Sequence, residues 1–170
     1  MLTREHLIIM ETSQIQNTIT FQSHFKITEV KGDLFSAPNS ASLAHCISRD
    51  CKLGAGIAKI FRQRFGRIDE LKSMNVMVGG VGPIRVNERF IYNLVTKEHY
   101  WGKPTYECLK KSLFAMKEHA IKHNVLEICM PRIGCGLDKL EWSKVMTILG
   151  EVFGGGAIHI VIFLNRNYKI

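Results

Sequence analysis

The sequence lacks any apolar run that approaches the roughly 18 residues a membrane-spanning helix needs, so we expect no membrane span. It has no Cys-x-x-Cys pair, and the spacing of its five cysteines matches no common zinc signature, so we expect no metal site. A complete Gly-x-Gly-x-x-Gly fingerprint and a Gly-x-x-x-x-Gly-Lys-Ser/Thr loop are also missing, which argues against two familiar nucleotide-binding motifs. The apolar patch near the start, residues 7–9, is shorter than the core of a secretory signal.

Acidic residues are fewer than basic ones in this chain of 170 residues. The chain has 23 Lys and Arg against 15 Asp and Glu, which gives a formal net charge of +8. This charge favours an anionic partner, although a soluble basic surface explains it equally well. Apolar residues make up 46% of the chain, an ordinary globular proportion, and the length fits one domain. The odd number of cysteines, several of them in apolar runs, indicates buried free thiols and a reducing, intracellular compartment.

Two regions of the chain differ in pattern. Residues 1–23 are largely polar, so we predict a flexible tail there and a folded domain over residues 24–170. Apolar runs and alternating patterns predict strands at residues 25–30, 42–48, 89–96, 126–130 and 157–164. Apolar residues at helical spacing predict helices at residues 57–65, 105–123 and 140–153, while residues 76–86 fit neither pattern. The alternation predicts an α/β protein, a three-layer α/β/α fold with a mostly parallel or mixed central sheet flanked by helices.

The first candidate motif is a glycine-containing turn between the strand at 42–48 and the helix at 57–65. Gly54 and Gly56 let the backbone approach a ligand closely, and the N-terminus of the following helix favours negative charge. Backbone amides arranged in this way hold phosphate groups. A tight turn without a ligand explains these glycines equally well.

A second Gly-x-Gly turn, formed by Gly134 and Gly136, follows the strand at 126–130 and precedes the helix at 140–153. Ligands of α/β sheets bind at the carboxyl ends of the strands, where both turns fall. Two such loops can hold a diphosphate from both sides, so the pairing is more informative than either loop alone. Asp138 is either the N-cap of the following helix or an acid/base group at the ligand.

Other candidate residues have a structural and a functional interpretation. Lys97, at the end of a predicted strand, is either a solvated charge or a nucleophilic amine. His45 lies in an apolar strand, and we interpret it as a core histidine rather than a base. The neighbouring aromatic residues Tyr100, Trp101 and Tyr106 either stack on bases or pack over the sheet. Thiol catalysis is disfavoured because no histidine is placed by the sequence to activate a cysteine.

Six stretches taken together resemble the macrodomain family, an ADP-ribose-binding α/β/α module. They are VKGDLF at 30–35, SLAHCIS at 42–48, GAGIA at 54–58, IYNLVTKE at 91–98, KPTYECL at 103–109 and MPRIGCGLD at 130–138. The resemblance runs from about residue 25 to residue 165. It is strongest toward the single-domain terminal ADP-ribose protein glycohydrolases, also described as O-acetyl-ADP-ribose deacetylases. Residues 74–86, Trp101, Gly102 and the predicted tail depart from the family pattern.

The resemblance implies a role for each matching residue. Lys97 corresponds to a catalytic lysine and Asp138 to a catalytic aspartate. Asp33 corresponds to the carboxylate that receives the adenine amino group, with Leu34 beside it. The remaining implied ligand contacts are a serine after the second strand, two diphosphate loops and two residues that close the adenine side, namely Ser48, Gly54, Ala55, Gly56, Ile57, Arg132, Ile133, Gly134, Cys135, Gly136, Leu137, Phe163 and Asn165.

The resemblance also implies a reaction that needs no metal and no cofactor. Lys97 attacks the anomeric carbon of the distal ribose and releases the carboxylate of a modified Glu or Asp. A transient lysyl adduct forms, and Asp138 assists proton transfer and breakdown of the adduct. Deacylation of O-acetyl-ADP-ribose and removal of ADP-ribose from a nucleobase are related reactions. The alternative function is a non-catalytic reader of ADP-ribose or poly(ADP-ribose), which needs the two loops but not the lysine and the aspartate.

The expected partners are ADP-ribose and mono-ADP-ribosylated proteins. The basic surface also fits poly(ADP-ribose) or nucleic acid, through release of counterions. A protein that only binds nucleic acid is a third hypothesis, although the sequence carries no recognised nucleic-acid motif. We expect a monomer in the nucleus and cytoplasm without membrane association, and the resemblance implies a role in the DNA damage response.

Overall fold

The computed structural model describes residues 17–21, 25–165 and 168. Its strands are β1 (Asn17–Phe21), β2 (Phe25–Lys31), β3 (Ser42–Ser48), β4 (Val81–Val86), β5 (Arg89–Lys97), β6 (Glu127–Met130) and β7 (His159–Leu164). Its helices are α1 (Gly56–Phe65), α2 (Ile68–Ser73), α3 (Tyr106–Lys122) and α4 (Trp142–Phe153), with a 3-10 turn η1 (Leu34–Ser36). In this part of the chain no helix is long and apolar enough to cross a membrane.

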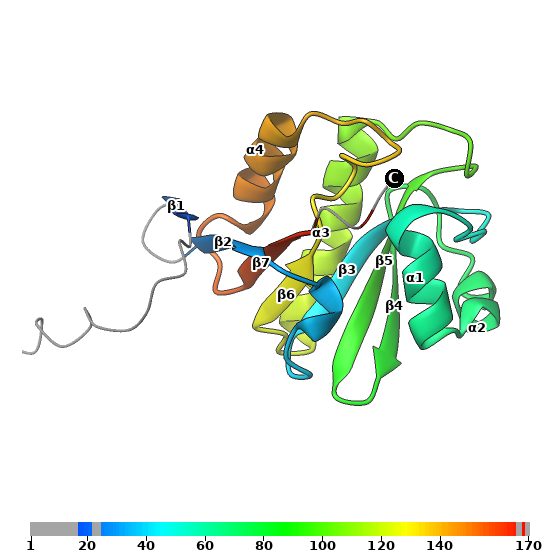
Figure 1. Ribbon diagram of the computed structural model, residues 1–170, viewed down its shortest axis with the longest axis horizontal. Coiled ribbons are helices and arrows are strands. Elements are labelled where there is room, and N and C mark those ends of the chain that lie inside the picture. The colour runs from blue at the N-terminus through cyan, green and yellow to red at the C-terminus, as the bar shows by residue number, and fades with distance from the viewer. Residues whose placement is uncertain (1–16, 22–24, 166–167, 169–170) are drawn as a thin grey trace, which may run out of the picture.

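The described strands form one sheet in the order β1-β2-β7-β6-β3-β5-β4 (Figure 1). The five central strands run parallel, while β1 and β4 pair antiparallel with their neighbours at the two edges. Parallel strands all end at the same edge of a sheet. The segments that follow β3, β5, β6 and β7 therefore come together there, although they are far apart in sequence.

Helices cover both faces of this sheet. Along β5, Tyr92 and Leu94 pack with α3 and α4, whereas Ile91 and Val95 pack with α1, α2 and η1. This division follows from the strand period of two, which points successive side chains to opposite faces. The result is two apolar cores on either side of a mixed sheet. The predicted three-layer α/β/α fold is confirmed.

Strand β1 differs from the sequence prediction. Residues 17–21, which the sequence pattern predicts as part of the tail, pair antiparallel with β2, from Asn17 opposite Glu29 to Phe21 opposite Phe25. The segment reads NTITF, and its β-branched residues favour a strand once a partner is present. The other residues predicted as tail, 1–16 and 22–23, lie outside the described residues.

Two further elements lie where no clear pattern was found. Helix α2 has only six residues, too few for a periodic apolar face, although Asp69 and Glu70 favour its N-terminus. Strand β4 contains Pro83, which breaks the usual strand pattern. Proline is tolerated here because β4 is an edge strand and leaves one side of its backbone without a neighbour in the sheet.

Candidate active site

The candidate site is a cleft of about 1200 Å³ at the carboxyl edge of the sheet. Its wall is built by the segments that follow β3, β5, β6 and β7. All but two of the predicted site residues line it, namely Ser48, Gly54, Ala55, Gly56, Ile57, Lys97, Arg132, Ile133, Gly134, Cys135, Gly136, Leu137, Asp138, Phe163 and Asn165. The sheet topology thus brings together residues that the sequence separates by more than a hundred positions.

Lys97 and Asp138 contact each other on the cleft wall. Lys97 is the last residue of β5, and its Nζ donates to Asp138 Oδ1 at 2.6 Å. The two side chains are 14% and 15% exposed, so Lys97 is not a solvated strand-end charge. Asp138 is not the N-cap of α4 either, because Glu141 takes that position. An amine therefore lies beside a carboxylate within reach of a molecule in the cleft.

Asp50, which the sequence reasoning missed, organises the first glycine loop. Its Oδ1 accepts from the Ser48 hydroxyl at 2.5 Å and the Lys52 amide at 3.2 Å, and its Oδ2 accepts from the Tyr100 amide at 2.9 Å. Burial acts to raise the pKa of Asp50, but these hydrogen bonds outweigh it and lower that pKa below its ordinary value. The available signal was an aspartate before a glycine-rich turn, typical of a side chain that bonds the backbone two residues on.

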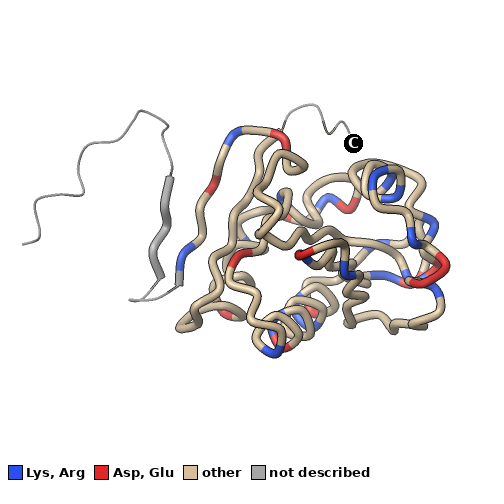
Figure 2. The backbone as a smooth tube through the Cα atoms, turned by 90° about the horizontal axis from the view of Figure 1, so that it is seen from below, with Lys and Arg blue, Asp and Glu red and all other residues tan. Residues whose placement is uncertain are grey.

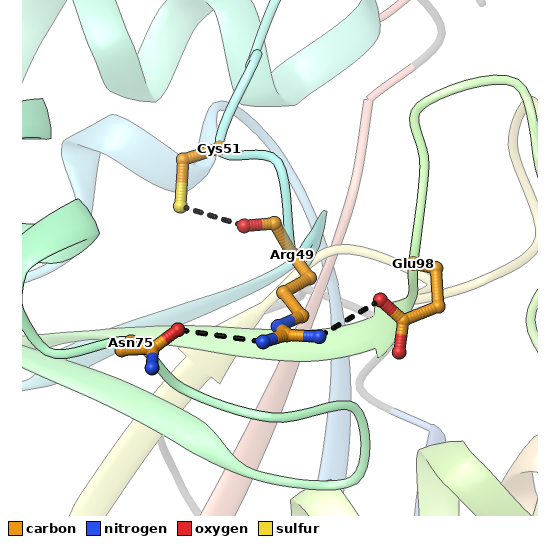
Figure 3. A network of polar contacts seen from close by, with 4 residues as sticks. All are labelled: Arg49, Cys51, Asn75 and Glu98. Atoms are coloured by element: carbon orange, nitrogen blue, oxygen red, sulfur yellow. Dashed lines mark hydrogen bonds and ion pairs between the residues drawn. The ribbon is translucent and has the colours of Figure 1, made fainter.

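Arg49 fastens this loop to the end of β5 (Figure 3). Its guanidinium lies 3.3 Å from Glu98 Oε2 and donates to Asn75 Oδ1 at 3.4 Å, while its carbonyl accepts from the Cys51 thiol at 3.4 Å. Its backbone N–H donates to the Lys97 carbonyl at 2.9 Å. The ion pair is partly exposed and contributes little alone, so the backbone bond is what ties the loop to Lys97.

The first loop leads directly into α1, whose first residues line the cleft. The N-cap of this helix is Ala55, which makes no side-chain capping hydrogen bond. The first amides of a helix have no partner within the helix, and its dipole favours negative charge at this end. The loop can therefore bind an anion, as the sequence indicates.

Gly134 holds the second loop in shape. Its φ of 72° lies in the left-handed region, and a Cβ there would lie 2.6 Å from Leu140 Cδ1. The Leu140 amide donates to the Gly134 carbonyl at 2.8 Å and closes the loop. Leu137 reaches toward the first loop, where its Cδ1 lies 3.7 Å from the position of a Cβ on Gly56. The two glycine loops thus approach each other, as their pairing predicts.

Asp33 and Leu34 are the two predicted ligand contacts that are absent from the described cleft wall. The side chain of Leu34 is fully buried in the core. The hydroxyl of Tyr168 donates to the Asp33 carboxylate and accepts from the Leu34 amide at 2.8 Å. Tyr168 lines the cleft in their place, and no sequence pattern signals this role for a tyrosine near the C-terminus.

The cysteines of the cleft are protonated thiols. Burial raises the pKa of Cys46 to about 12 and that of Cys135 to about 11. His45 is fully buried, stacks on Phe61 and makes a 2.7 Å hydrogen bond with Asn93. Burial lowers the pKa of His45 to about 4, and its interpretation as a core residue is confirmed. Thiols whose pKa is raised in this way are poor nucleophiles at neutral pH. The described residues hold no cluster of three His, Cys, Asp or Glu.

Of the three neighbouring aromatic residues singled out in the sequence, one lines the cleft and two lie outside its wall. Tyr100 lines the cleft, with the Lys52 ammonium 4.0 Å from its ring centre. Trp101 is 68% exposed beside it. Tyr106 begins α3, and its hydroxyl accepts from the Glu141 amide at 3.1 Å. Tyr106 also packs against the core that α3 and α4 share, so packing explains it, whereas Tyr100 belongs to the site.

Lys and Arg positions are frequent along the backbone at the end of the molecule that carries α1 and α2, where a few acidic positions also lie (Figure 2). The basic surface consists of the exposed residues Lys52, Lys59, Arg62, Arg64, Arg67, Lys72 and Arg85. It begins at the first glycine loop, because Lys52 also lines the cleft. A long anion that enters the cleft can therefore continue onto this surface.

Comparison with known proteins gives two similarities. The chain is 49% identical to the ADP-ribose glycohydrolase OARD1 of Homo sapiens and of Bos taurus over 138 residues, 81% of this chain and 91% of each relative. The macrodomain of Thermus aquaticus DarG has a TM-score of 0.74 at 20% identity and covers 83% of this chain and 99% of its own. No family model matches the chain. The first similarity spans most of both chains, and the second shows the fold.

Proposed function

Because this chain belongs to the ADP-ribose glycohydrolase OARD1 family of macrodomains and is a hydrolase, we propose that it removes ADP-ribose from glutamate and aspartate side chains. The observation that carries the proposal is the ion pair between Lys97 and Asp138, 2.6 Å apart on the wall of the cleft. A protein that only reads ADP-ribose needs the two glycine loops but not this pair. The buried amine and carboxylate therefore favour the enzyme over the reader.

The order of the strands supports one direction for the bound ligand. Phe163 and Asn165 lie at the end of β7 and Lys97 at the end of β5, with β6 and β3 between them. Neighbouring strands lie about 4.8 Å apart, so the two ends of the cleft are about 14 Å apart. The adenosine lies at the β7 end in this proposal. The diphosphate crosses the glycine loops, and the distal ribose reaches Lys97.

Backbone amides hold the diphosphate in the proposed complex. On one side are the first amides of α1, which begins at Gly56 and has no side-chain cap. On the other side is the second loop, whose backbone is set by the positive φ of Gly134. Arg132 adds a cation at the rim, where it is 46% exposed and lies 3.5 Å from Glu29. Amide donors suit this position because a glycine backbone can approach the phosphates closely.

The proposed reaction begins when the Lys97 ammonium loses a proton to Asp138, its neighbour at 2.6 Å. The neutral amine attacks the anomeric carbon of the distal ribose, and the bond from that carbon to the acidic side chain breaks. The bonding electron pair leaves with the released carboxylate. Water then displaces Lys97 from the same carbon, which yields free ADP-ribose and restores the amine. Asp138 gives the first proton to the departing carboxylate. It then accepts a proton from the attacking water and returns it to Lys97, which restores the ion pair.

The same cleft accommodates O-acyl-ADP-ribose, whose ester also lies on the distal ribose. We therefore include deacylation of O-acetyl-ADP-ribose in the proposal, as a second reaction of one site. Mono-ADP-ribosylated proteins are the proposed partners, with poly(ADP-ribose) or nucleic acid as additional ligands of the basic surface. The proposed setting is a monomer in the nucleus and cytoplasm.

The test uses the purified full-length protein with a peptide mono-ADP-ribosylated on glutamate and, in parallel, with O-acetyl-ADP-ribose. Mass spectrometry should detect free ADP-ribose together with the unmodified peptide. Binding of ADP-ribose without release from the peptide would contradict the glycohydrolase proposal. Turnover of O-acetyl-ADP-ribose alone would restrict the activity to deacylation.

A further inference from the structure

Tyr168 holds two polar groups at the adenosine end of the cleft. Its hydroxyl donates to the Asp33 carboxylate and accepts from the Leu34 amide at 2.8 Å. Its ring packs edge-on against Phe35, with the ring centres 6.2 Å apart, and lines the cleft together with Phe163. One hydroxyl therefore makes hydrogen bonds with both the Asp33 carboxylate, an acceptor, and the Leu34 amide, a donor.

The groups that Tyr168 occupies form a pair that can read adenine. The Watson–Crick edge of adenine presents the N6 amino donor next to the N1 acceptor. A carboxylate beside a backbone N–H satisfies both at once, and these are the groups of Asp33 and Leu34. A tyrosine hydroxyl is also a donor and an acceptor, so it makes the same two hydrogen bonds through one oxygen.

Both side chains are in the protonation states that this contact needs. The hydrogen bond from Tyr168 is the main cause that lowers the pKa of Asp33, so this group is a carboxylate at neutral pH. Burial and the hydrogen bond to Asp33 raise the pKa of Tyr168 to about 12, so the hydroxyl keeps its proton. The contact is therefore stable across the physiological pH range.

We propose that Tyr168 competes with the adenine of ADP-ribose for Asp33 and Leu34 and thereby sets the affinity for the adenosine half of substrate and product. This inference rests on the proposed function, because it takes ADP-ribose as the ligand. The Leu34 amide has one proton and cannot serve the hydroxyl and the adenine at once. The apparent affinity for ADP-ribose is then the intrinsic affinity multiplied by the fraction of molecules in which Tyr168 has left this position. Weaker binding at this end favours release of the product after hydrolysis.

The test is Tyr168→Phe in the full-length protein, which removes the hydroxyl and keeps the ring against Phe35. We expect ADP-ribose to bind about tenfold more tightly by isothermal titration calorimetry, because two hydrogen bonds no longer have to break. Ribose 5-phosphate, which lacks adenine, should bind the variant and the wild type equally. Tyr92→Phe is the matched control, since its hydroxyl contacts His119 Nδ1 at 3.1 Å outside the cleft. A second variant, Tyr168→Ala, should also bind ADP-ribose more tightly than the wild type.

Each other outcome overturns a stated part of this inference. Unchanged or weaker binding of ADP-ribose to Tyr168→Phe would show that Tyr168 does not compete with the ligand. An equal gain for ribose 5-phosphate would show that the effect does not lie at the base, and it would also overturn the proposal. If the folded wild type, the control and both variants all fail to bind ADP-ribose, the proposed function itself is wrong. Absence of binding in all four proteins differs from measurable and equal affinities, which would overturn only the role of Tyr168.

Discussion

Single residues outside the glycine motifs prepare this site for its ligand. Asp50 connects the first loop to the turn after β5 by accepting from the Lys52 and Tyr100 amides. It also accepts from the Ser48 hydroxyl at 2.5 Å, so Ser48 faces the cleft with its hydroxyl already engaged. The loop geometry therefore exists before a ligand arrives, which reduces the ordering cost of binding.

Asp50→Asn should make the protein less stable at neutral pH by about 1 kcal/mol, a figure that allows for the solvent exposure of this loop. Burial acts to raise the pKa of Asp50 in the folded state, but its hydrogen bonds have the larger effect and lower that pKa. The stabilisation is therefore complete above the ordinary aspartate pKa and is lost as the pH falls through the lower folded value. Urea unfolding at pH 7 and at about pH 3 should show a difference between wild type and variant that shrinks in acid. A difference of the same size at both pH values would contradict this role for the charge.

The sequence pattern alone did not predict that Lys97 and Asp138 contact each other and are largely buried. Lys97 and Asp138 are 41 positions apart in the chain, and no local pattern shows that their side chains meet. Their contact depends on the parallel pairing of β3 with both β5 and β6. The family resemblance pointed to both residues, whereas the residue types alone left a solvated lysine and a helix cap as alternatives. Tyr168 was missed because its role depends on the position of Asp33.

Strands and helices with a clear apolar period were predicted well at the element scale. Strand β3 lies at the predicted residues, and the ends of α3 differ from the prediction by one residue each. These elements bury a continuous face, so their composition reflects the core. The elements β1, α2 and β4 were not predicted, because β1 and β4 are edge strands held by pairing with β2 and β5, and α2 has only six residues. Tertiary pairing determines such elements.

The second glycine loop gives a prediction at this scale. Gly136→Glu places a bulky anion on the cleft wall where we propose that the diphosphate binds. Binding of ADP-ribose should weaken by at least about a hundredfold in calorimetry, because steric exclusion and charge repulsion act together. Gly155→Glu is the control, since a Cβ there meets no atom within 4 Å. The φ of 75° at Gly155 strains any side chain, so folding of both variants is checked by circular dichroism before binding is compared. Equal affinities of Gly136→Glu and the control would mean that the loop is assigned wrongly.

The charge distribution is a property of the whole molecule. The net charge is +8, and the basic surface on α1, α2 and β4 begins at the cleft. Its residues belong to one side of the fold because α1 and α2 cover the same face of the sheet. We propose that this surface is a second binding region for polyanionic ligands, in addition to the amides of the cleft.

Lys59→Gln combined with Lys72→Gln should weaken binding of poly(ADP-ribose) and leave the affinity for monomeric ADP-ribose unchanged. Both side chains are exposed. Each lysine–phosphate ion pair that is lost should make the dependence of log Kd on log salt concentration shallower by about one, so the double variant should change it by about two. Fluorescence anisotropy over a salt series measures both effects. The combination Lys110→Gln and Lys122→Gln removes the same charge from α3 on the opposite face of the sheet. Equal weakening in the two double variants would show that net charge, and not the basic surface, drives binding.

The reaction itself is tested most directly by the rate of ADP-ribose release in Lys97→Ala, with the affinity for ADP-ribose measured on the same preparation. We predict that release from a glutamate-linked peptide falls to background, because the nucleophilic amine is gone. The affinity should stay within a few-fold of the wild type, since the glycine loops supply the phosphate contacts. Turnover that persists in Lys97→Ala would contradict the assignment of Lys97 as the nucleophile. Loss of binding together with turnover would assign Lys97 to ligand binding instead.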